Sequence, residues 1–167
     1  MVVALVIVAI ILYILNSAQG HIKFYAQDRT FKNLLIVTLI LTLIQVIAGT
    51  QVRQFTDEQV KMLGYENMHM VLQQPEFSFY FHRTFSIVVA MANLWLYFRN
   101  KKLKLGYYKL NWVLWLLALE IASGIAMYYF DFPFGSQSLH LIVASLLFGV
   151  QFYLILENIR KPKATLA

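Results

Sequence analysis

Two histidines in the hydrophobic parts of this sequence could carry chemistry. His82 lies about five residues into one long apolar run, and His140 opens another in the same way. A histidine inside a membrane segment is costly to bury and usually has a function. If both runs are helices that cross the membrane in the same direction, both imidazoles lie within roughly 10 Å of the same boundary, at about 1.5 Å per residue. Two imidazoles at one depth are suited to bind a haem iron from both sides.

Small and aromatic residues near the histidines fit this interpretation. Ser86 and Ala144 each follow a histidine by four residues, so they share its helix face and leave room for a porphyrin. Phe79 and Phe85 flank His82 three residues away on either side. Ligation by two histidines fills both axial positions, which favours electron transfer or a structural role over oxygen binding. The alternative is that each histidine is a hydrogen-bonded packing residue.

Three polar residues cluster near the expected outer boundary of the membrane. Arg53, Arg83 and Gln137 could bind haem propionates through charge-assisted hydrogen bonds. The alternative for Arg83 is that its side chain extends to the lipid headgroups.

Glu120 is the other residue that is costly to place in a membrane. It lies near the middle of its apolar run, so we expect it to be protonated or paired. A role in proton transfer and a structural hydrogen bond to a facing helix are both open. Its counterpart in an internal repeat is Gln45, a neutral amide, which indicates that the position needs hydrogen bonding rather than charge.

The repeat relates Gln45-Val46-Ile47-Ala48-Gly49 to Glu120-Ile121-Ala122-Ser123-Gly124. Each segment is followed by an outer connection and then by a histidine-bearing run. The four long runs therefore predict two related hairpins that pack as a four-helix bundle, as parallel repeats would. The glycines that end the two segments, Gly49 and Gly124, are predicted sites of close helix packing, the alternative being contact with a cofactor.

Polar residues also recur eleven positions after each histidine. They are Asn93 and Gln151. Eleven residues is about three helical turns, so each of these residues shares a face with its histidine. We predict that both make hydrogen bonds between helices.

The composition is that of an integral membrane protein. Of 167 residues 60% are hydrophobic and only 13% are charged, which is outside the usual range of soluble domains. The absence of cysteine excludes disulfides, iron–sulfur clusters and covalent c-type haem attachment. The net charge of +6 is distributed as expected for membrane orientation, so nucleic acid is not an expected partner.

Five apolar segments predict an all-α, polytopic membrane protein. The last four have the roughly 20 residues that a spanning helix needs. The first is shorter, and we interpret it as one short N-terminal spanning helix, the end of a longer preceding one. The expected organisation is 1–16 as the end of a preceding transmembrane helix, 17–32 as a cytoplasmic connection, 33–160 as a four-helix haem-binding bundle with an outer loop at 51–76, and 161–167 as a cytoplasmic tail.

The distribution of lysine and arginine predicts the orientation. Eleven of the 14 basic residues fall in 17–32, in 99–109 and in the C-terminal tail. The positive-inside rule makes these segments cytoplasmic, with the N-terminus outside and the C-terminus inside. The opposite side carries the more acidic loop 51–76, for which we predict a short helix on the outer surface, the alternative being a partly disordered loop.

At these residues the chain resembles heme A synthase, a membrane enzyme of cytochrome oxidase assembly. The family has eight spanning helices in two homologous halves, each with a pair of helix-borne histidines. On this resemblance the chain corresponds to the C-terminal half, and His82 and His140 are the axial ligands of its haem b. The resemblance is carried by Ala48-Gly49-Thr50-Gln51-Val52-Arg53, by Phe81-His82-Arg83, and by Leu119 to Gly124 together with Phe132 to His140.

The resemblance implies an oxidoreductase that converts the C8 methyl group of haem O to the formyl group of haem A. The N-terminal half of the family, with the histidine pair and glutamate associated with oxidation, has no counterpart here. We therefore expect a cofactor site without a complete catalytic site, either in a fragment or in one of two chains, and we assign no residue a catalytic role. Expected partners are membrane lipid, haem O and haem A, haem O synthase and a second copy of the chain, in the cell inner (plasma) membrane.

Two other functions are compatible with the residues alone. The first is a small bis-histidine b-type membrane cytochrome that acts only in electron transfer. The second is a haem-free membrane subunit or transporter in which the histidines only pack.

Overall fold

A computed structural model describes residues 2–18, 28–70, 75–133 and 135–159, and every regular element in these ranges is helical, as predicted. Most of the expected connection 17–32, the tail 161–167 and His21 lie outside the described residues. The elements are α1 (Val2–Ala18), α2 (Arg29–Leu63), the short 3₁₀ helix η1 (Tyr65–Met70), α3 (Phe77–Lys102), α4 (Leu110–Tyr129) and α5 (Ser136–Ile159).

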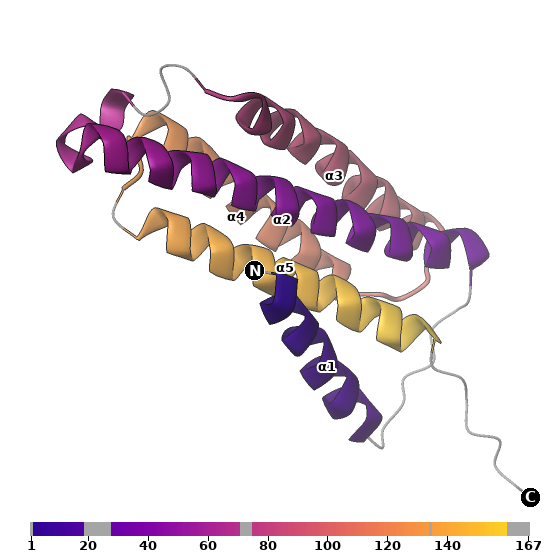
Figure 1. Cartoon of the computed structure of the whole chain (residues 1–167). Helices are drawn as coiled ribbons and strands as arrows, with labels where there is room; N and C mark the ends of the chain where they lie inside the picture. Colours follow the sequence, from indigo (N-terminus) through magenta and orange to yellow (C-terminus); the bar gives the residue numbers. More distant parts are fainter. Residues whose placement is uncertain (1, 19–27, 71–74, 134, 160–167) are drawn as a thin grey trace, which may run out of the picture.

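The helices α2 to α5 form a bundle in which each packs against two others. α2 packs against α3 and α5, and α4 packs against the same two helices from the other side. The histidine-bearing helices α3 and α5 therefore lie on one diagonal of the bundle, and α2 and α4 lie on the other (Figure 1). Side chains that project from α3 and α5 toward the bundle axis can meet there.

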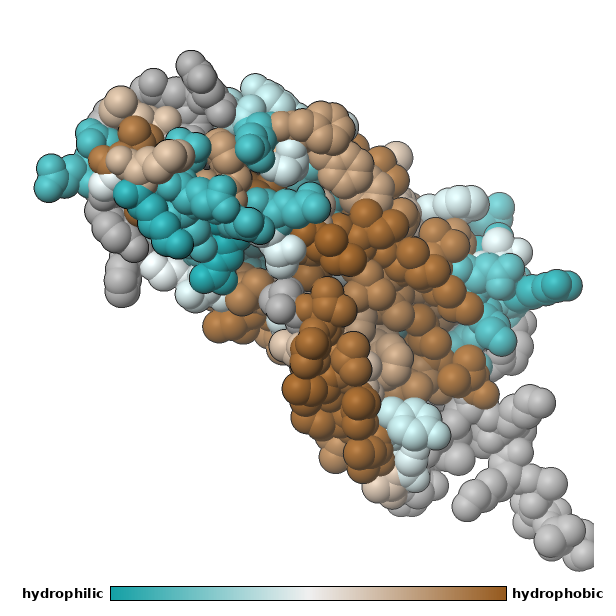
Figure 2. Space-filling model, viewed as in Figure 1, coloured by the Kyte–Doolittle hydropathy of each residue, from teal (hydrophilic) through white to brown (hydrophobic). Residues whose placement is uncertain are grey.

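The surface of the bundle is that of a multi-pass membrane protein. Within the described residues, three helices are long and apolar enough to cross a bilayer: α2, α4 and α5. A hydrophobic band separates hydrophilic surface at the two ends of the molecule (Figure 2). α3 has 26 residues but is not among these three, so its crossing of the membrane stays a prediction.

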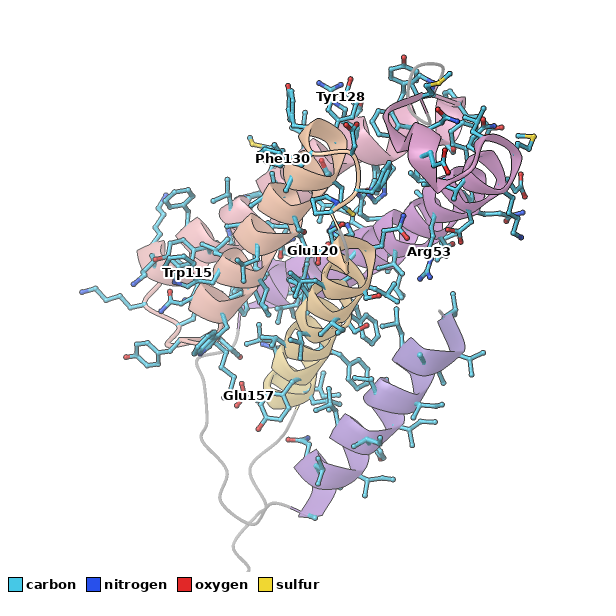
Figure 3. The ribbon with its side chains drawn as sticks, turned by 90° about the vertical axis from the view of Figure 1, so that its left-hand side faces the viewer. Arg53, Trp115, Glu120, Tyr128, Phe130 and Glu157 are labelled. Carbon is cyan, nitrogen blue, oxygen red and sulfur yellow. The ribbon has the colours of Figure 1, made fainter. Side chains whose placement is uncertain are left out.

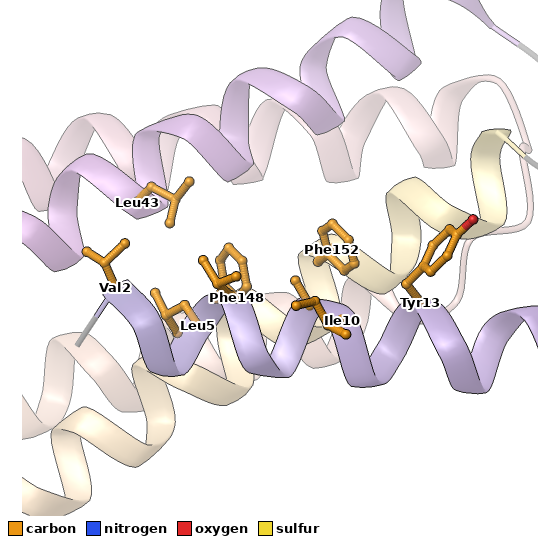
Figure 4. A pocket seen from close by; sticks show the side chains of 9 residues that line it. Val2, Leu5, Ile10, Tyr13, Leu43, Phe148 and Phe152 are labelled. Carbon is orange, nitrogen blue, oxygen red and sulfur yellow. The ribbon is translucent and has the colours of Figure 1, made fainter.

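α1 is a shorter apolar helix that packs against α5. Val8 and Leu12 lie within van der Waals distance of Gly149, at 3.6 Å from the position a Cβ would take there. A cleft of about 360 Å³ opens along another part of α1 (Figure 4). Its lining is apolar and comes from α1, α2 and α5: Val2, Leu5, Val6, Ala9, Ile10, Tyr13, Leu43, Phe148 and Phe152.

α2 is longer than the sequence pattern predicted. The expected spanning segment ended near residue 50, but the helix continues to Leu63 and ends at Gly64, whose φ of +81° favours glycine. Phe55 and Thr56 are buried, so one face of the helix remains covered past the predicted end. The separate surface helix expected within 51–76 is replaced by this extension and by η1.

A buried hydrogen bond crosses the bundle below the histidines. The Gln151 side-chain amide donates to Asn93 Oδ1 at 3.0 Å, and Asn93 Nδ2 donates to the Val89 carbonyl at 2.8 Å. Gln151 and Asn93 are each only 1% exposed. The prediction that both make hydrogen bonds between helices is confirmed, and the bond fixes the register of α3 against α5.

We expect Asn93→Ala to lower the stability of the chain by about 1 to 2 kcal/mol, because it leaves the buried Gln151 amide without its acceptor. Replacing Asn93 and Gln151 together with leucine should cost less, because no polar group is then left unpaired. Thermal unfolding of the two variants in detergent measures the difference. An Asn93→Ala variant as stable as the parent chain would contradict a structural role for this bond.

An ion pair and a helix cap coincide at the start of α2. Asp28 accepts the Phe31 backbone N–H at 2.7 Å and two hydrogen bonds from Arg99 of α3, at 2.8 and 3.0 Å. The Arg99 hydrogen bond, together with the Phe31 N–H, holds the pKa of the Asp28 carboxyl below its ordinary value of 3.8. This interaction joins α2 to α3 at the end of the bundle opposite the histidines.

We expect Asp28→Asn to reduce the acid sensitivity of the fold. A depressed pKa contributes stability that is present above the unfolded value near 3.8 and is lost as the pH falls through the lower folded value. Asparagine keeps a cap oxygen for Phe31 but does not titrate, so the variant should be less stable than the parent at neutral pH and show a flatter profile below about pH 4. Thermal unfolding between about pH 3 and 7 gives both profiles, and parallel curves would contradict this role for Asp28.

Candidate cofactor site

The two histidines singled out by the sequence meet in the bundle. The imidazole centroids of His82 on α3 and His140 on α5 are 6.4 Å apart, and the ring planes are inclined at 72°. Both residues are half-buried. The pairing follows from the diagonal placement of α3 and α5, because each ring projects from its helix toward the bundle axis.

His82 is held by the neighbouring helix α2. Its Nδ1 lies 3.2 Å from the backbone carbonyl of Gln45, which can only accept a hydrogen bond. Nδ1 therefore carries the proton, and in the neutral ring Nε2 keeps a lone pair. The Gln45 amide nitrogen donates to the His82 backbone carbonyl at 3.0 Å and lies 3.5 Å from Nε2, too far for a strong hydrogen bond.

Gly49 makes room for the His82 ring. A Cβ at this position would lie 3.0 Å from Cε1 and 3.4 Å from Nδ1 of His82. The prediction of close packing at Gly49 therefore finds a specific neighbour, which is an imidazole rather than the backbone of another helix. Any larger residue at this position must displace the ring.

His140 is held by side chains of α4. Its Nδ1 lies 2.7 Å from Ser123 Oγ, and its Nε2 lies 3.2 Å from Glu120 Oε2. Ser123 Oγ also donates its one proton to the Glu120 backbone carbonyl at 3.0 Å, so the His140 Nδ1–H is the donor to Oγ. A Cβ at Gly124 would lie 3.8 Å from His140 Cε1, an ordinary contact.

Glu120 is paired, as the sequence analysis expected. Its Oε2 lies against His140, and its Oε1 is buried without a hydrogen-bond partner among the described residues. Glu120 lies partway along α4, between Trp115 and the Tyr128 end (Figure 3). The structure thus associates this carboxyl group with one of the two candidate ligands, a contact that the sequence analysis did not identify.

The repeat-related residues Gln45 and Glu120 occupy matching roles. Each comes from the first helix of a hairpin and lies beside Nε2 of the histidine on the second helix. Sequence reasoning missed these contacts and the one between Ser123 and His140. The repeat indicates which helices adjoin the two histidines, since its two segments precede the two histidine-bearing helices in the same order, but it does not indicate which side chains meet.

The three residues predicted to bind propionates lie on separate helices. Arg53 is half-exposed on α2 and pairs with Asp57 at 3.7 Å, and the Arg83 guanidinium on α3 lies 5.9 Å from the Tyr128 ring centroid. Gln137 is in the first turn of α5. No hydrogen bond or ion pair joins Arg53, Arg83 and Gln137 in the described part of the chain, and their binding role stays a prediction.

Aromatic side chains gather at this end of the bundle. Phe79 stacks on Tyr128 at 5.7 Å between ring centroids, and Phe81 stacks on Phe85 at 5.3 Å. Tyr128 and Phe130 lie at the end of the molecule opposite Glu157 (Figure 3). Aromatic belts of this kind are typical of a membrane–water interface, which agrees with the predicted position of the histidines near one boundary.

The fold and the site define a multi-pass helical membrane protein that holds two facing imidazoles between helical hairpins. Residues 1–152 match the family model of the cytochrome oxidase assembly protein, COX15-CtaA, and the chain belongs to this family. This confirms the predicted membership of the heme A synthase family, and it supports a role in cytochrome oxidase assembly. No curated protein and no solved structure matched the chain.

Proposed function

We propose that the chain is the haem b-binding C-terminal half of a heme A synthase, the oxidoreductase that converts the C8 methyl of haem O to the formyl of haem A. The observation that carries this proposal is the facing pair His82 and His140, 6.4 Å apart. The family match favours this function over the small b-type cytochrome, which would use the same pair.

The residues fit a haem. Two imidazoles that bind opposite sides of one metal ion, each with a nitrogen about 2 Å from it, have ring centroids roughly 6 Å apart. Within the described residues there is no group of three or more histidine, cysteine or acidic side chains that could hold a metal ion. Two neutral nitrogen ligands suit a metal whose other ligands come from a macrocycle.

The residues of the chain have distinct proposed roles in this site. His82 and His140 would hold the iron, with Nε2 as the nitrogen left free to bind it, while the Gln45 carbonyl and Ser123 Oγ fix the tautomer and orientation of the rings. Haem b supplies one-electron transfer when it is bound. Because both histidines would be occupied in holding the iron, we assign the oxidation of haem O to the other, homologous half of the enzyme. Arg53, Arg83 and Gln137 are the proposed propionate contacts.

We further propose that the protein lies in the cell inner (plasma) membrane with its N-terminus outside and its C-terminus in the cytoplasm. The basic residues of 17–32, of 99–109 and of the tail support this orientation. The histidines then lie near the outer face. Haem O and haem A would be exchanged through the other half of the enzyme, with haem O synthase and a second copy of the chain as proposed partners.

The proposal is tested by purifying the chain from a haem-competent host and recording its reduced-minus-oxidised spectrum. We expect about one b-type haem per chain, and no b-type signal when His82 and His140 are both replaced by alanine. The matched control is His21→Ala with His69→Ala, which replaces the other two histidines of the sequence and should keep the signal. A normal b-type signal in the His82→Ala, His140→Ala variant would refute the ligand assignment.

A further inference from the structure

The two histidines are held by unlike groups. The His82 Nδ1–H is bound by a backbone carbonyl of α2, whose position is fixed by the helix. The His140 Nδ1–H is bound by Ser123 Oγ, a side-chain hydroxyl that can rotate away. The two hairpins are related by the internal repeat, so this difference is not imposed by the architecture.

The His82 ring also has less space around it than the His140 ring. The His82 ring packs against the backbone at Gly49, where a Cβ would be only 3.0 Å away. The corresponding distance from Gly124 to His140 is 3.8 Å, so the ring on α5 is less tightly confined. A tightly packed ring loses less conformational freedom when it binds a metal, because most of that freedom is already lost in the folded chain.

The two Nε2 atoms also differ in the side chains that lie beside them and would compete with a metal for them. His140 Nε2 lies 3.2 Å from the Glu120 carboxyl group, whose other oxygen is buried without a partner in the described structure. Among the described residues, the polar group beside His82 Nε2 is the Gln45 amide, at 3.5 Å. Binding of iron to His140 must displace the Glu120 carboxyl group from its 3.2 Å contact with Nε2, whereas release of His140 restores that contact.

We propose that His82 is the anchoring ligand of the haem and that His140 is an exchangeable ligand whose place a small neutral molecule can take. This inference rests on the proposed function, because it needs a haem between the two rings. It adds to that function the statement that the coordination position on the α4–α5 side of the haem is the one that can become vacant. Glu120 is then a positioning residue that receives the released imidazole.

The test compares His82→Ala with His140→Ala in the full chain, with carbon monoxide as the probe. We expect His140→Ala to retain most of its haem as a high-spin form that binds carbon monoxide when reduced. The haem content of His82→Ala should be lower than that of His140→Ala by at least about tenfold, because its remaining ligand, His140, is the less tightly constrained of the two. Size-exclusion profiles in detergent show whether each variant is folded.

A second pair of variants keeps the test independent of folding yield. His140→Gly is purified with its haem and titrated with free imidazole, which should restore the low-spin spectrum by filling the vacated position. In the parent chain, Glu120→Gln should lower the fraction of haem that reacts with carbon monoxide, because an amide competes less well than a carboxyl group for the His140 ring.

The outcomes separate the two proposals. If the parent chain contains no haem, the proposed function fails, and this inference fails with it. If the parent contains low-spin haem but His82→Ala keeps as much haem as His140→Ala, or more, the ligands are not unequal in the sense proposed. That result, or a haem-loaded His140→Ala variant that does not bind carbon monoxide when reduced, overturns the inference while the proposed function stands.

Discussion

Gly49→Ala should lower the haem content of the purified chain by about tenfold to a hundredfold, the range observed when groups that support a metal ligand are altered. The added methyl group would lie 3.0 Å from Cε1 of His82, so the ring must move. The movement also strains the hydrogen bond from Nδ1 to the Gln45 carbonyl, which fixes the tautomer that binds metal. Spectroscopic determination of haem per chain measures the effect.

Gly124→Ala is the matched control for this variant. It makes the same chemical change at the repeat-related position, but its methyl group would lie 3.8 Å from His140 Cε1. This is an ordinary van der Waals contact, so the ring does not have to move. The haem content should stay close to that of the parent. Equal losses in the two variants would show that helix packing, and not the position of the imidazole, determines the effect of these glycines.

Ser123→Ala should convert a large part of the haem to a high-spin form without releasing it. The substitution removes the acceptor of the His140 Nδ1–H, which lies 2.7 Å away, and leaves that group without its partner. We expect the affinity of His140 for the iron to fall by about tenfold to a hundredfold, while His82 keeps the haem in place. The absorption spectrum of the oxidised protein reports the high-spin fraction directly.

Ser145→Ala is the control for the loss of a serine hydroxyl group, here on α5, the helix that carries His140. Ser145 is on α5, and its Oγ donates only to the Leu141 carbonyl of its own helix, at 2.9 Å. Its substitution should leave the haem low-spin. A Ser123→Ala variant whose spectrum matches that of Ser145→Ala would contradict the role assigned to the Ser123 hydroxyl.

The sequence was sufficient to predict the helical class and the closeness of the two histidines, because both predictions depend on strong local signals. Long apolar runs specify membrane helices, and His82 and His140 are conspicuous within them. That Asn93 and Gln151 each make a hydrogen bond between helices was predictable for the same reason, since each residue shares a helix face with its histidine, but their pairing with each other was not predicted. These features need only the helical period and the cost of polar groups in a membrane.

The contacts around the two rings could not be predicted from periodicity. Whether Nδ1 meets a backbone carbonyl or a serine depends on the rotation of one helix against its neighbour, which the pattern of α2 and α4 leaves open. The pairing of Glu120 with His140 is of this kind, as is the close approach of Gly49 to His82. Such features depend on side-chain packing across helices.

The end of α2 was missed for a different reason. Residues after 50 are polar enough to resemble a loop, and the prediction placed a separate surface helix there. Burial of Phe55 and Thr56 shows that one face of this stretch still packs against its neighbours. Tertiary packing therefore extends the helix beyond its apolar part.

Electron paramagnetic resonance of the oxidised chain tests most directly whether His82 and His140 bind one haem from opposite sides. We expect a low-spin ferric signal of the highly anisotropic type that strongly inclined axial imidazoles produce, since the ring planes are 72° apart. This signal should be absent from His82→Ala and from His140→Ala. A low-spin signal that is unchanged in either variant would contradict ligation by this pair.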